Sequence, residues 1–369
     1  MNVTIVSAST GGGHNSAMQA LRERFAELGA ETRAVDLYAC CGHAAYRFVE
    51  RSYLFVSQRM RRGYRGVYRM LESYPGARRA ASAATRQGYV ADCLGAALGE
   101  TDVVVSAHPF AAHALDTLIK RGELDVPVVA LVTDWCVQPF IEDSTSLTAI
   151  CFPSPLLLPE AEAKGVRNAV ATGLPVRREF LSSLPAEEAR RALGLDPGRD
   201  TVLVMGGSMG YGNMFPTVSE LLERGIQTIC VCGSNEALKR KLEKLEGPLL
   251  ALGFTDEVAL CMDAADLIVT KAGGLTVTEL IAKRLPAVIS ASIPGQEERN
   301  GDFLIKHGGA LRPEAGRVAA EAAALLADRA RLKAMSDALA GLRTPDACGE
   351  ICSLALSLAE SAAAHARKG

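Results

Sequence analysis

Runs of apolar residues recur along the chain, and polar or glycine-rich segments separate them. The runs are short and nearly continuous in aliphatic and β-branched residues, which is typical of strands buried on both faces of a parallel sheet. Segments with helical spacing lie between them, such as residues 15–28 after the first run. The pattern predicts strands at Val3–Ser7, Thr32–Leu37, Asp102–Ser106, Val128–Thr133, Thr148–Phe152, Thr201–Met205, Thr228–Val231, Leu249–Gly253, Leu267–Thr270 and Ala287–Ala291.

Strand–helix alternation predicts the α/β class with parallel sheets. Because 369 residues exceed one compact core, we expect two domains, divided near "GLPVRREFLSSLPAEEA", where Gly and Pro interrupt the pattern. The predicted domains are residues 1–177 and 178–345, each with ligand sites at the carboxyl ends of its strands. The Ala-rich stretch 319–367 is predicted to be helical. Its last part, residues 346–369, is expected to form a helix that caps both domains.

The composition is that of a soluble globular protein, with 49% hydrophobic residues, 22% charged residues and a net charge of −2. The N-terminal segment lacks the basic region of a signal peptide. The uncharged stretch Ser144–Pro159 contains three prolines and is too short for a membrane helix. Ten cysteines without a Cys-x-x-Cys pair are expected to be small buried apolar residues. These features indicate a cytoplasmic location.

A first glycine-rich turn, "STGGGHNSAMQAL", follows the predicted strand Val3–Ser7. It lacks the Gly-x-Gly-x-x-Gly fingerprint because Ser16 stands at the last position, although Asp36 lies where a ribose-binding acid would fall. A helix that starts near His14 would favour a neutral imidazole that can accept a proton. Three interpretations of this turn stay open at this point: dinucleotide binding, a proton-accepting His14, and a plain turn with His14 in water.

A second turn, "DLIVTKAGGLTVTEL", places backbone amides at Gly274, Leu275 and Thr276, which together with the Thr276 hydroxyl can cradle a diphosphate. Glu279 falls on the same side of the following helix and can accept hydrogen bonds from two ribose hydroxyls. The alternative is an ordinary helix start with Glu279 in water. The next loop, "SIPGQEERN", favours the first interpretation, because its five polar residues 296–300 follow the neighbouring strand and suit a polyhydroxyl sugar.

The stretch from His43 to Val90 carries ten arginines against two glutamates, with Tyr and Phe residues interleaved. Basic and apolar sides on one helix suit binding in the plane of an anionic bilayer. The same composition also suits single-stranded nucleic acid, which we consider the weaker interpretation. A third possibility is an ordinary amphipathic helix with solvated arginines.

These motifs carry a family resemblance. "DLIVTKAGGLTVTEL", "PAVIS" and "PGQEERN" resemble the C-terminal signature of the monogalactosyldiacylglycerol synthase and processive diacylglycerol glucosyltransferase family, and "STGGGHNSAMQAL" is similar to its N-terminal loop. More distantly, both resemble the peptidoglycan N-acetylglucosaminyltransferase that makes lipid II. The matches "SAHPF", "VTDW", "ATGLPV", "VMGGSMGYG" and "VCGSNEAL" follow in the right order, so the resemblance covers most of the chain.

The resemblance implies a GT-B fold, with two facing Rossmann-like domains, an N-terminal acceptor domain and a C-terminal UDP-sugar domain. The implied activity is transfer of a hexose from a UDP-sugar to the hydroxyl of a membrane lipid, diacylglycerol being the expected acceptor, with inversion. It implies no cofactor, no metal and no nucleic acid partner. It places the protein peripherally on the inner face of the cell membrane, which the basic stretch would contact.

Site residues carry over by position. The resemblance implies a catalytic role for His14, with Asp134 and His108 as further candidates for the base or for the group that orients it. It implies that the donor is bound by Gly12, Gly13, Gly206, Gly207, Ser208, Phe254, Gly273, Gly274, Leu275, Thr276, Glu279, Gln296, Glu297 and Asn300. Within this set, Glu279 is implied for the ribose, Phe254 for the uracil, and Gln296, Glu297 and Asn300 for the sugar.

Two positions depart from the family pattern. Gln138 stands where members often have a histidine, and it cannot accept a proton, so a catalytic role at that position is in doubt. Ala272 stands where members tend to have proline, a change that leaves the amide cradle intact. The alternatives to a diacylglycerol transferase are a polyprenyl-linked or other lipophilic acceptor, a catalytically idle UDP-sugar sensor, and a dinucleotide oxidoreductase.

Overall fold

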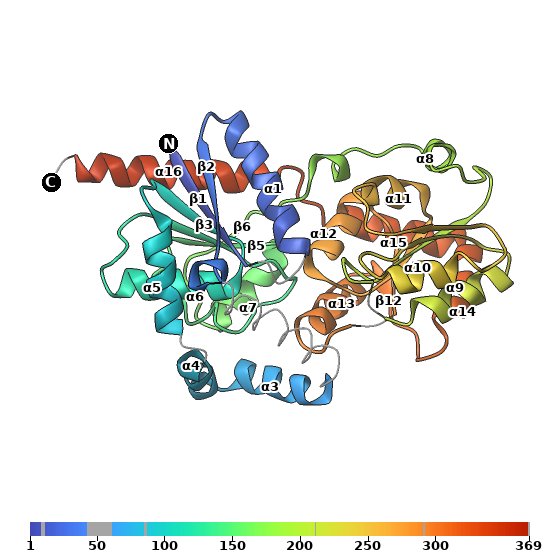
Figure 1. Ribbon diagram of the computed structural model, residues 1–369, viewed down its shortest axis with the longest axis horizontal. Helices are drawn as coiled ribbons and strands as arrows, with labels where there is room; N and C mark the ends of the chain where they lie inside the picture. The colour runs from blue at the N-terminus through green and yellow to red at the C-terminus, as the bar shows by residue number, and fades with distance from the viewer. Residues whose placement is uncertain (9–11, 43–60, 85–86, 211, 291, 368–369) are drawn as a thin grey trace. The chain divides into compact units, whose positions relative to one another are not determined.

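The computed structural model describes residues 1–8, 12–42, 61–84, 87–210, 212–290 and 292–367, and for a few of them, residues 12–15 included, it describes the backbone only. The chain forms two compact units, each built on a six-stranded parallel sheet (Figure 1). The first unit comprises Met1–Arg177, Pro294–Gln296 and Thr344–Gly369. The second comprises Arg178–Ile293 and Glu297–Arg343.

The sheet of the first unit has the strand order β2-β1-β3-β4-β5-β6, with every described pair parallel. Its strands are β1 (Asn2–Ser7), β2 (Glu31–Asp36), β3 (Val103–Ser106), β4 (Val128–Leu131), β5 (Ala149–Phe152) and β6 (Ala169–Ala171). Because the chain moves to one side of β1 for β2 and to the other side for β3, the order reverses between β1 and β3. Ligands of such sheets bind at this reversal, beyond the carboxyl ends of the strands.

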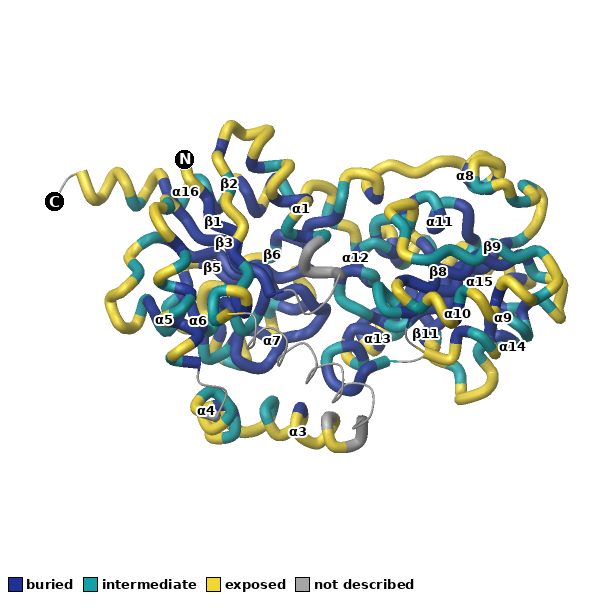
Figure 2. The backbone as a smooth tube through the Cα atoms, viewed as in Figure 1, coloured by how far each residue is buried: buried dark blue, intermediate teal, exposed yellow. Residues whose placement is uncertain are grey.

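Helices cover both faces of this sheet, since its central strands are buried along nearly their whole length (Figure 2). The helices are α1 (Gly12–Glu27), η1 (Ala39–Cys41), α3 (Arg61–Ser73), α4 (Pro75–Ala84), α5 (Gln87–Leu98), α6 (Pro109–Lys120), η2 (Pro155–Leu157), α7 (Leu158–Ala163) and α16 (Ala347–Ala366). One face is closed by α1 and α16 together: Leu21 and Phe25 of α1 and Ile351 of α16 join Val3 and Ile5 in one core.

The C-terminal stretch is helical, as predicted. It consists of three helices, of which α14 (Val318–Ala327) and α15 (Arg329–Ala340) belong to the second unit and α16 to the first. By length and hydropathy α16 would also suit a membrane span, the one such helix within the described part of the chain. Ile351, Cys352 and Ala355 are nevertheless fully buried in the core of the first unit, as expected of a core helix.

The sheet of the second unit repeats the first, with the order β12-β11-β10-β7-β8-β9 and parallel pairs throughout. Its strands are β7 (Thr201–Met205), β8 (Gln227–Val231), β9 (Leu249–Leu252), β10 (Leu267–Thr270), β11 (Ala287–Ile289) and β12 (Ala310–Leu311). Here the order reverses between β7 and β10. These two strands pair in parallel, with Val202 of β7 opposite Leu267 of β10.

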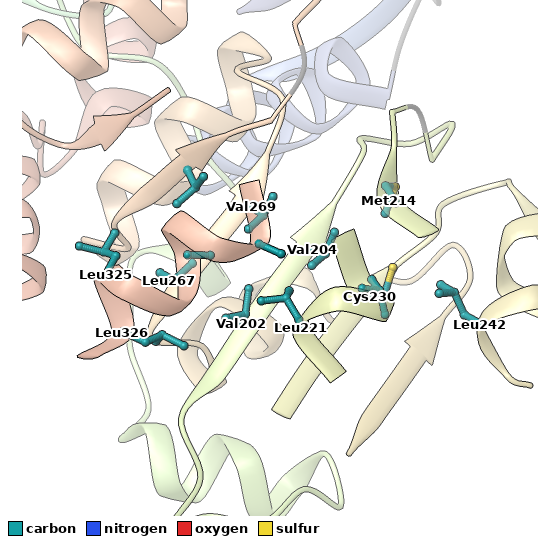
Figure 3. Packing of buried hydrophobic residues seen from close by; sticks show 14 of the residues in the cluster. Val202, Val204, Met214, Leu221, Cys230, Leu242, Leu267, Val269, Leu325 and Leu326 are labelled. Carbon is teal, nitrogen blue, oxygen red and sulfur yellow. The ribbon is translucent and has the colours of Figure 1, made fainter. Parts of the chain in front are cut away.

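The remaining helices of this unit are η3 (Arg178–Phe180), α8 (Ala186–Ala192), α9 (Met214–Glu223), α10 (Glu236–Leu242), α11 (Val258–Ala264), α12 (Gly274–Lys283) and α13 (Gln296–Lys306). Val202, Val204 and Val269 point from the sheet into a core that α9 and α14 close with Leu221 and Leu325 (Figure 3).

The predicted α/β class with parallel sheets is confirmed, and each of the predicted strands is present. The pattern missed β6 and β12, which lie at sheet edges and contain three and two residues. Such short edge strands bury too few side chains to leave a continuous apolar run.

Candidate functional site

Two loops meet at the strand reversal of the second unit, because they leave the carboxyl ends of the adjacent strands β7 and β10. Residues 206–212 follow β7, and residues 271–273 follow β10 and lead into α12. A third loop follows β11, the other neighbour of β10, and leads into α13. The sheet order therefore brings together three of the sequence motifs predicted to bind one ligand.

The turn after β10 is built to present main-chain amides. Gly273 is the N-cap of α12 and has no side chain to cap the helix. The first amides of a helix lack acceptors within it and lie at the positive end of its dipole. Gly273, Gly274 and Thr276 are half-buried rather than sealed in the core, while Leu275 anchors the turn with a buried side chain. The arrangement suits an anion such as a diphosphate.

The loop after β7 needs glycine at two of its positions. Gly207 has a φ of +74°, and a methyl group there would approach Lys271 Cε to 2.7 Å. Gly210 has a φ of +59°, and a methyl group there would collide with the Cys232 carbonyl oxygen at 2.0 Å. The Ser208 carbonyl in turn accepts from the Ser234 amide at 2.8 Å. Glycine allows these left-handed conformations, which hold the loop close to the amide cradle.

Lys271 is a residue of this site that the sequence interpretation did not single out. Its ammonium forms an ion pair with Glu297 Oε1, and Glu297 Oε2 accepts from the Ile293 amide at 2.7 Å. Glu297 is only 6% exposed. The signal in the sequence was a lysine directly after a buried strand and directly before the glycine turn.

Asn300 and Gln296 are both predicted to contact the sugar, but they differ in how deeply they are buried. Asn300 is fully buried and its side-chain amide donates to the Ala272 carbonyl at 3.0 Å, so it supports the turn from below. Gln296 is the first residue of α13 and is half-buried. Glu297 and Asn300 thus connect α13 to the turn after β10.

Two residues are suitably placed for the nucleoside. Glu279 lies on α12, half-buried and one turn beyond the amides of the cradle. Phe254 lies between β9 and α11, and it is 70% exposed, which is unusual for a large apolar side chain. Because α11 packs against α12, the loop of Phe254 leads toward the helix that carries Glu279. An exposed aromatic ring can stack on a base.

In the first unit, the candidate catalytic residues follow three adjacent strands, β1, β3 and β4. Gly12, Gly13 and His14 form the first turn of α1, and their side chains lie outside the described part of the chain. His108 is the buried N-cap of α6, and its Nδ1 accepts from the Phe110 amide at 3.2 Å. In the neutral imidazole the proton is then on Nε2, which makes His108 a hydrogen-bond donor at that nitrogen.

Asp134 lies three residues beyond β4 and is buried. Its Oδ2 accepts a hydrogen bond from the side-chain amide of Gln138, which is also buried. Gln138 therefore contacts a candidate base, although it cannot itself accept a proton. This connection between the two residues could not be inferred from their spacing in a loop.

Of the basic stretch 43–90, residues 43–60 lie outside the described part of the chain, and the rest includes α3, α4 and the start of α5. On α3 and just beyond it, Val67, Met70 and Tyr74 are 50%, 46% and 63% exposed, and Arg65 and Arg69 are exposed beside them. The helix is joined to α4, where buried Arg78 forms ion pairs with Glu142 and Asp143 (Arg78 Nη1–Glu142 Oε1 and Nε–Asp143 Oδ2, both 2.5 Å).

The ten cysteines are free, and six of them are buried, in agreement with the prediction of small apolar residues. Burial raises the pKa of the Cys151 and Cys261 thiols to about 12, so these two are inert at neutral pH. Within the described residues, no three His, Cys, Asp or Glu side chains are grouped so as to hold a metal ion.

Comparison with known families divides the chain at the same place as the fold. Residues 14–176 match the family model of monogalactosyldiacylglycerol (MGDG) synthase. Residues 201–347 match the C-terminal domain of glycosyltransferase family 28. The first match begins at His14, directly after the glycines of the N-terminal turn, and the second includes the amide cradle.

Curated relatives include enzymes for two different sugars. Monogalactosyldiacylglycerol synthase 1 of Arabidopsis thaliana is 29% identical over 330 residues, which cover 83% of this chain and 61% of the relative. The processive diacylglycerol β-glucosyltransferase of Bacillus pumilus is 33% identical over 146 residues, 38% of each chain. The chain thus spans less than two thirds of the length of the Arabidopsis protein.

Solved structures agree on the fold. The crystal structure of Acinetobacter baumannii MurG matches with a TM-score of 0.61 and 16% identity, over 96% of this chain and 99% of that chain. HepE of Anabaena, solved in complex with UDP, matches with a TM-score of 0.52 and 13% identity, over the full length of both chains. At this identity the likeness establishes architecture alone, and it confirms the predicted GT-B fold.

Proposed function

We propose that the chain transfers a hexose from a UDP-sugar to the hydroxyl of a membrane lipid, diacylglycerol in the first instance. The proposal agrees with the match of residues 14–176 to the monogalactosyldiacylglycerol synthase family and of residues 201–347 to the C-terminal domain of glycosyltransferase family 28. The observation that carries the proposal is the half-exposed, glycine-capped N-terminus of α12 at the strand reversal of the second unit.

The donor would bind along the carboxyl edge of the second sheet. The amides of Gly274, Leu275 and Thr276 would hold the diphosphate, as helix N-termini hold phosphates in other proteins. Glu279 would accept from the ribose hydroxyls, and the exposed ring of Phe254 would cover the uracil. UDP bound to the structurally similar HepE of Anabaena supports this nucleotide.

The transfer would proceed by direct displacement with inversion. The acceptor hydroxyl gives its proton to a base while its oxygen attacks the anomeric carbon, and the bond from that carbon to the UDP oxygen breaks with its electron pair on UDP. We assign His14 as the base, with Asp134 as the second candidate. His108, whose Nδ1 is engaged by the Phe110 amide, suits a hydrogen-bond donor better than a base. The amides at α12 would stabilise the charge on the departing UDP.

The acceptor would be collected at an anionic membrane surface. Exposed Val67, Met70 and Tyr74, with Arg65 and Arg69, support this role for α3, since apolar insertion and basic attraction add on one helix. We therefore propose a peripheral location on the inner face of the cell membrane. The relatives named for galactose and for glucose leave both hexoses as candidate donors.

The test is transfer of label from radioactive UDP-galactose and UDP-glucose, in separate reactions, to vesicles of diacylglycerol mixed with an anionic phospholipid. We expect label in the lipid phase with one of the two sugars and none with His14→Ala. Absence of label in diacylglycerol with both sugars would contradict the proposal. Label in a polyprenyl-linked acceptor instead would favour that alternative. Protection by UDP against thermal unfolding without any turnover would instead indicate a UDP-sugar sensor, the alternative that Gln138 favours.

A further inference from the structure

We propose that Lys271 supplies the positive charge that neutralises the diphosphate of the donor, and that Glu297 is the positioning residue that holds this ammonium in place. The inference rests on the proposed function and deepens it. It assigns to the donor site a cation that the sequence motifs did not reveal.

The ammonium of Lys271 lies between the two glycine loops. A methyl group on Gly207 would approach Lys271 Nζ to 3.5 Å, and one on Gly273 would approach it to 3.8 Å. Gly207 belongs to the loop after β7 and Gly273 is the N-cap of α12, so the charge lies at the strand reversal beside the amide cradle. The lysine side chain is 18% exposed, which leaves it in contact with solvent at the site.

Glu297 is arranged to hold this charge. One of its oxygens accepts from Lys271 and the other from the Ile293 amide at 2.7 Å, which fixes the carboxylate within the loop after β11. The carboxylate is itself almost fully buried, and a buried carboxylate without a partner is unfavourable. Glu297 therefore keeps Lys271 folded back over the cradle.

An ammonium has three N–H donors and one hydrogen bond to Glu297 uses only one of them. The others can reach a diphosphate that binds at the amides of Gly274 and Leu275, so Lys271 would bridge Glu297 and the donor. When the bond between the anomeric carbon and the UDP oxygen breaks, the new negative charge develops beside this ammonium, which would stabilise it.

The first measurement compares UDP with uridine by titration calorimetry, because only UDP carries the diphosphate. We expect Lys271→Met to weaken UDP binding by about ten- to a hundredfold, the range for a charged hydrogen bond, and to leave uridine binding unchanged. Lys271→Arg should recover part of the UDP affinity because it keeps the charge. The control is Lys333→Met on α15, a lysine that is 75% exposed and pairs only with its helical neighbour Asp337, and it should bind UDP as the wild type does.

The second measurement concerns Glu297. Glu297→Gln removes the charge that holds the Lys271 ammonium in place, so it should weaken UDP binding in the wild-type background and leave it unchanged when combined with Lys271→Met. A purely structural role would instead lower the melting temperature equally in both backgrounds and leave UDP affinity the same.

The outcomes separate the inference from the proposed function. If the wild-type protein binds UDP and Lys271→Met binds it equally well, the role of Lys271 is refuted and the proposed function stands. If the wild-type protein binds neither UDP nor any UDP-sugar, the proposed function fails first.

Discussion

The side-chain amide of Gln138 donates a hydrogen bond to Asp134 Oδ2, and both residues are buried beyond the carboxyl end of β4. A glutamine cannot accept the proton of the acceptor, but its amide can orient a carboxylate and favour its charged form. The departure from the family pattern at this position is therefore compatible with catalysis. It makes Gln138 a candidate positioning residue and Asp134 the group through which it would act.

The consequence can be tested at Gln138. Gln138→Ala should lower the rate of transfer by about ten- to a hundredfold, since it removes a hydrogen bond to a charged group. UDP affinity should not change, because the residue lies in the first unit. A loss of UDP affinity as large as the loss of rate would indicate a disrupted structure and not a positioning role.

Glu279 allows a test of ribose recognition. Glu279→Ala should weaken UDP binding by about tenfold, because in the proposed function this carboxylate would accept hydrogen bonds from the ribose hydroxyls. The variant should also lose the preference of the wild type for UDP over 2′-deoxy-UDP, which calorimetry measures directly. Glu187→Ala on α8 serves as the control, because this carboxylate is exposed and pairs with Arg191 of the same helix. Equal discrimination in the variant and the wild type would place the ribose elsewhere.

The exposed side of α3 predicts vesicle binding. Replacing Arg65 and Arg69 by Gln should reduce partitioning onto anionic vesicles by about thirtyfold, since each basic residue near such a surface contributes about 1 kcal/mol. Val67→Asp with Met70→Asp should reduce it further by preventing apolar insertion. Sedimentation with vesicles measures the effect. Leu156→Asp, at an exposed apolar site far from α3 in the sequence, should bind as the wild type does.

His113 predicts a pH dependence of stability in the first unit. Burial lowers the pKa of this imidazole below its usual 6.5, and the carboxylates of Asp116 and Asp143 offset that only in part, while Lys120 adds to it. It also lies against the Phe140 ring and 3.1 Å from Ser82 Oγ. Because the unfolded state binds the proton more readily, the stabilisation is complete above pH 6.5 and is lost as the pH falls through the lowered pKa.

Thermal unfolding at several pH values checks this expectation. His113→Gln, which cannot titrate, should lose less stability than the wild type between pH 7 and pH 5. Parallel curves for the two proteins would show that His113 is not the group responsible.

The architecture was largely accessible from the sequence because buried parallel strands leave short but nearly uninterrupted apolar runs, as β7 and β10 do. The positions of ligand loops at strand ends follow from that architecture alone. The contacts within the site were not accessible. The pairing of Lys271 with Glu297 joins residues 26 positions apart, and it depends on which strand lies next to β10.

Asn300 illustrates a second reason for the difference. A polar residue in a loop motif suits a ligand or the interior equally well, and only the fold shows that its amide holds the Ala272 carbonyl. The sequence could not assign α16 to the first unit for the same reason, because an Ala-rich helix can pack on either sheet.

The return of α16 to the first unit also constrains how the protein is made. Val3 and Ile5 share a core with Ile351, Ala355 and Ala359, which follow the whole second unit in the sequence. During synthesis the N-terminal sheet therefore stays without α16, with part of one apolar face uncovered, until the second unit has been made. A fragment cut at the boundary after Arg177 would carry that uncovered surface permanently, as a site for aggregation.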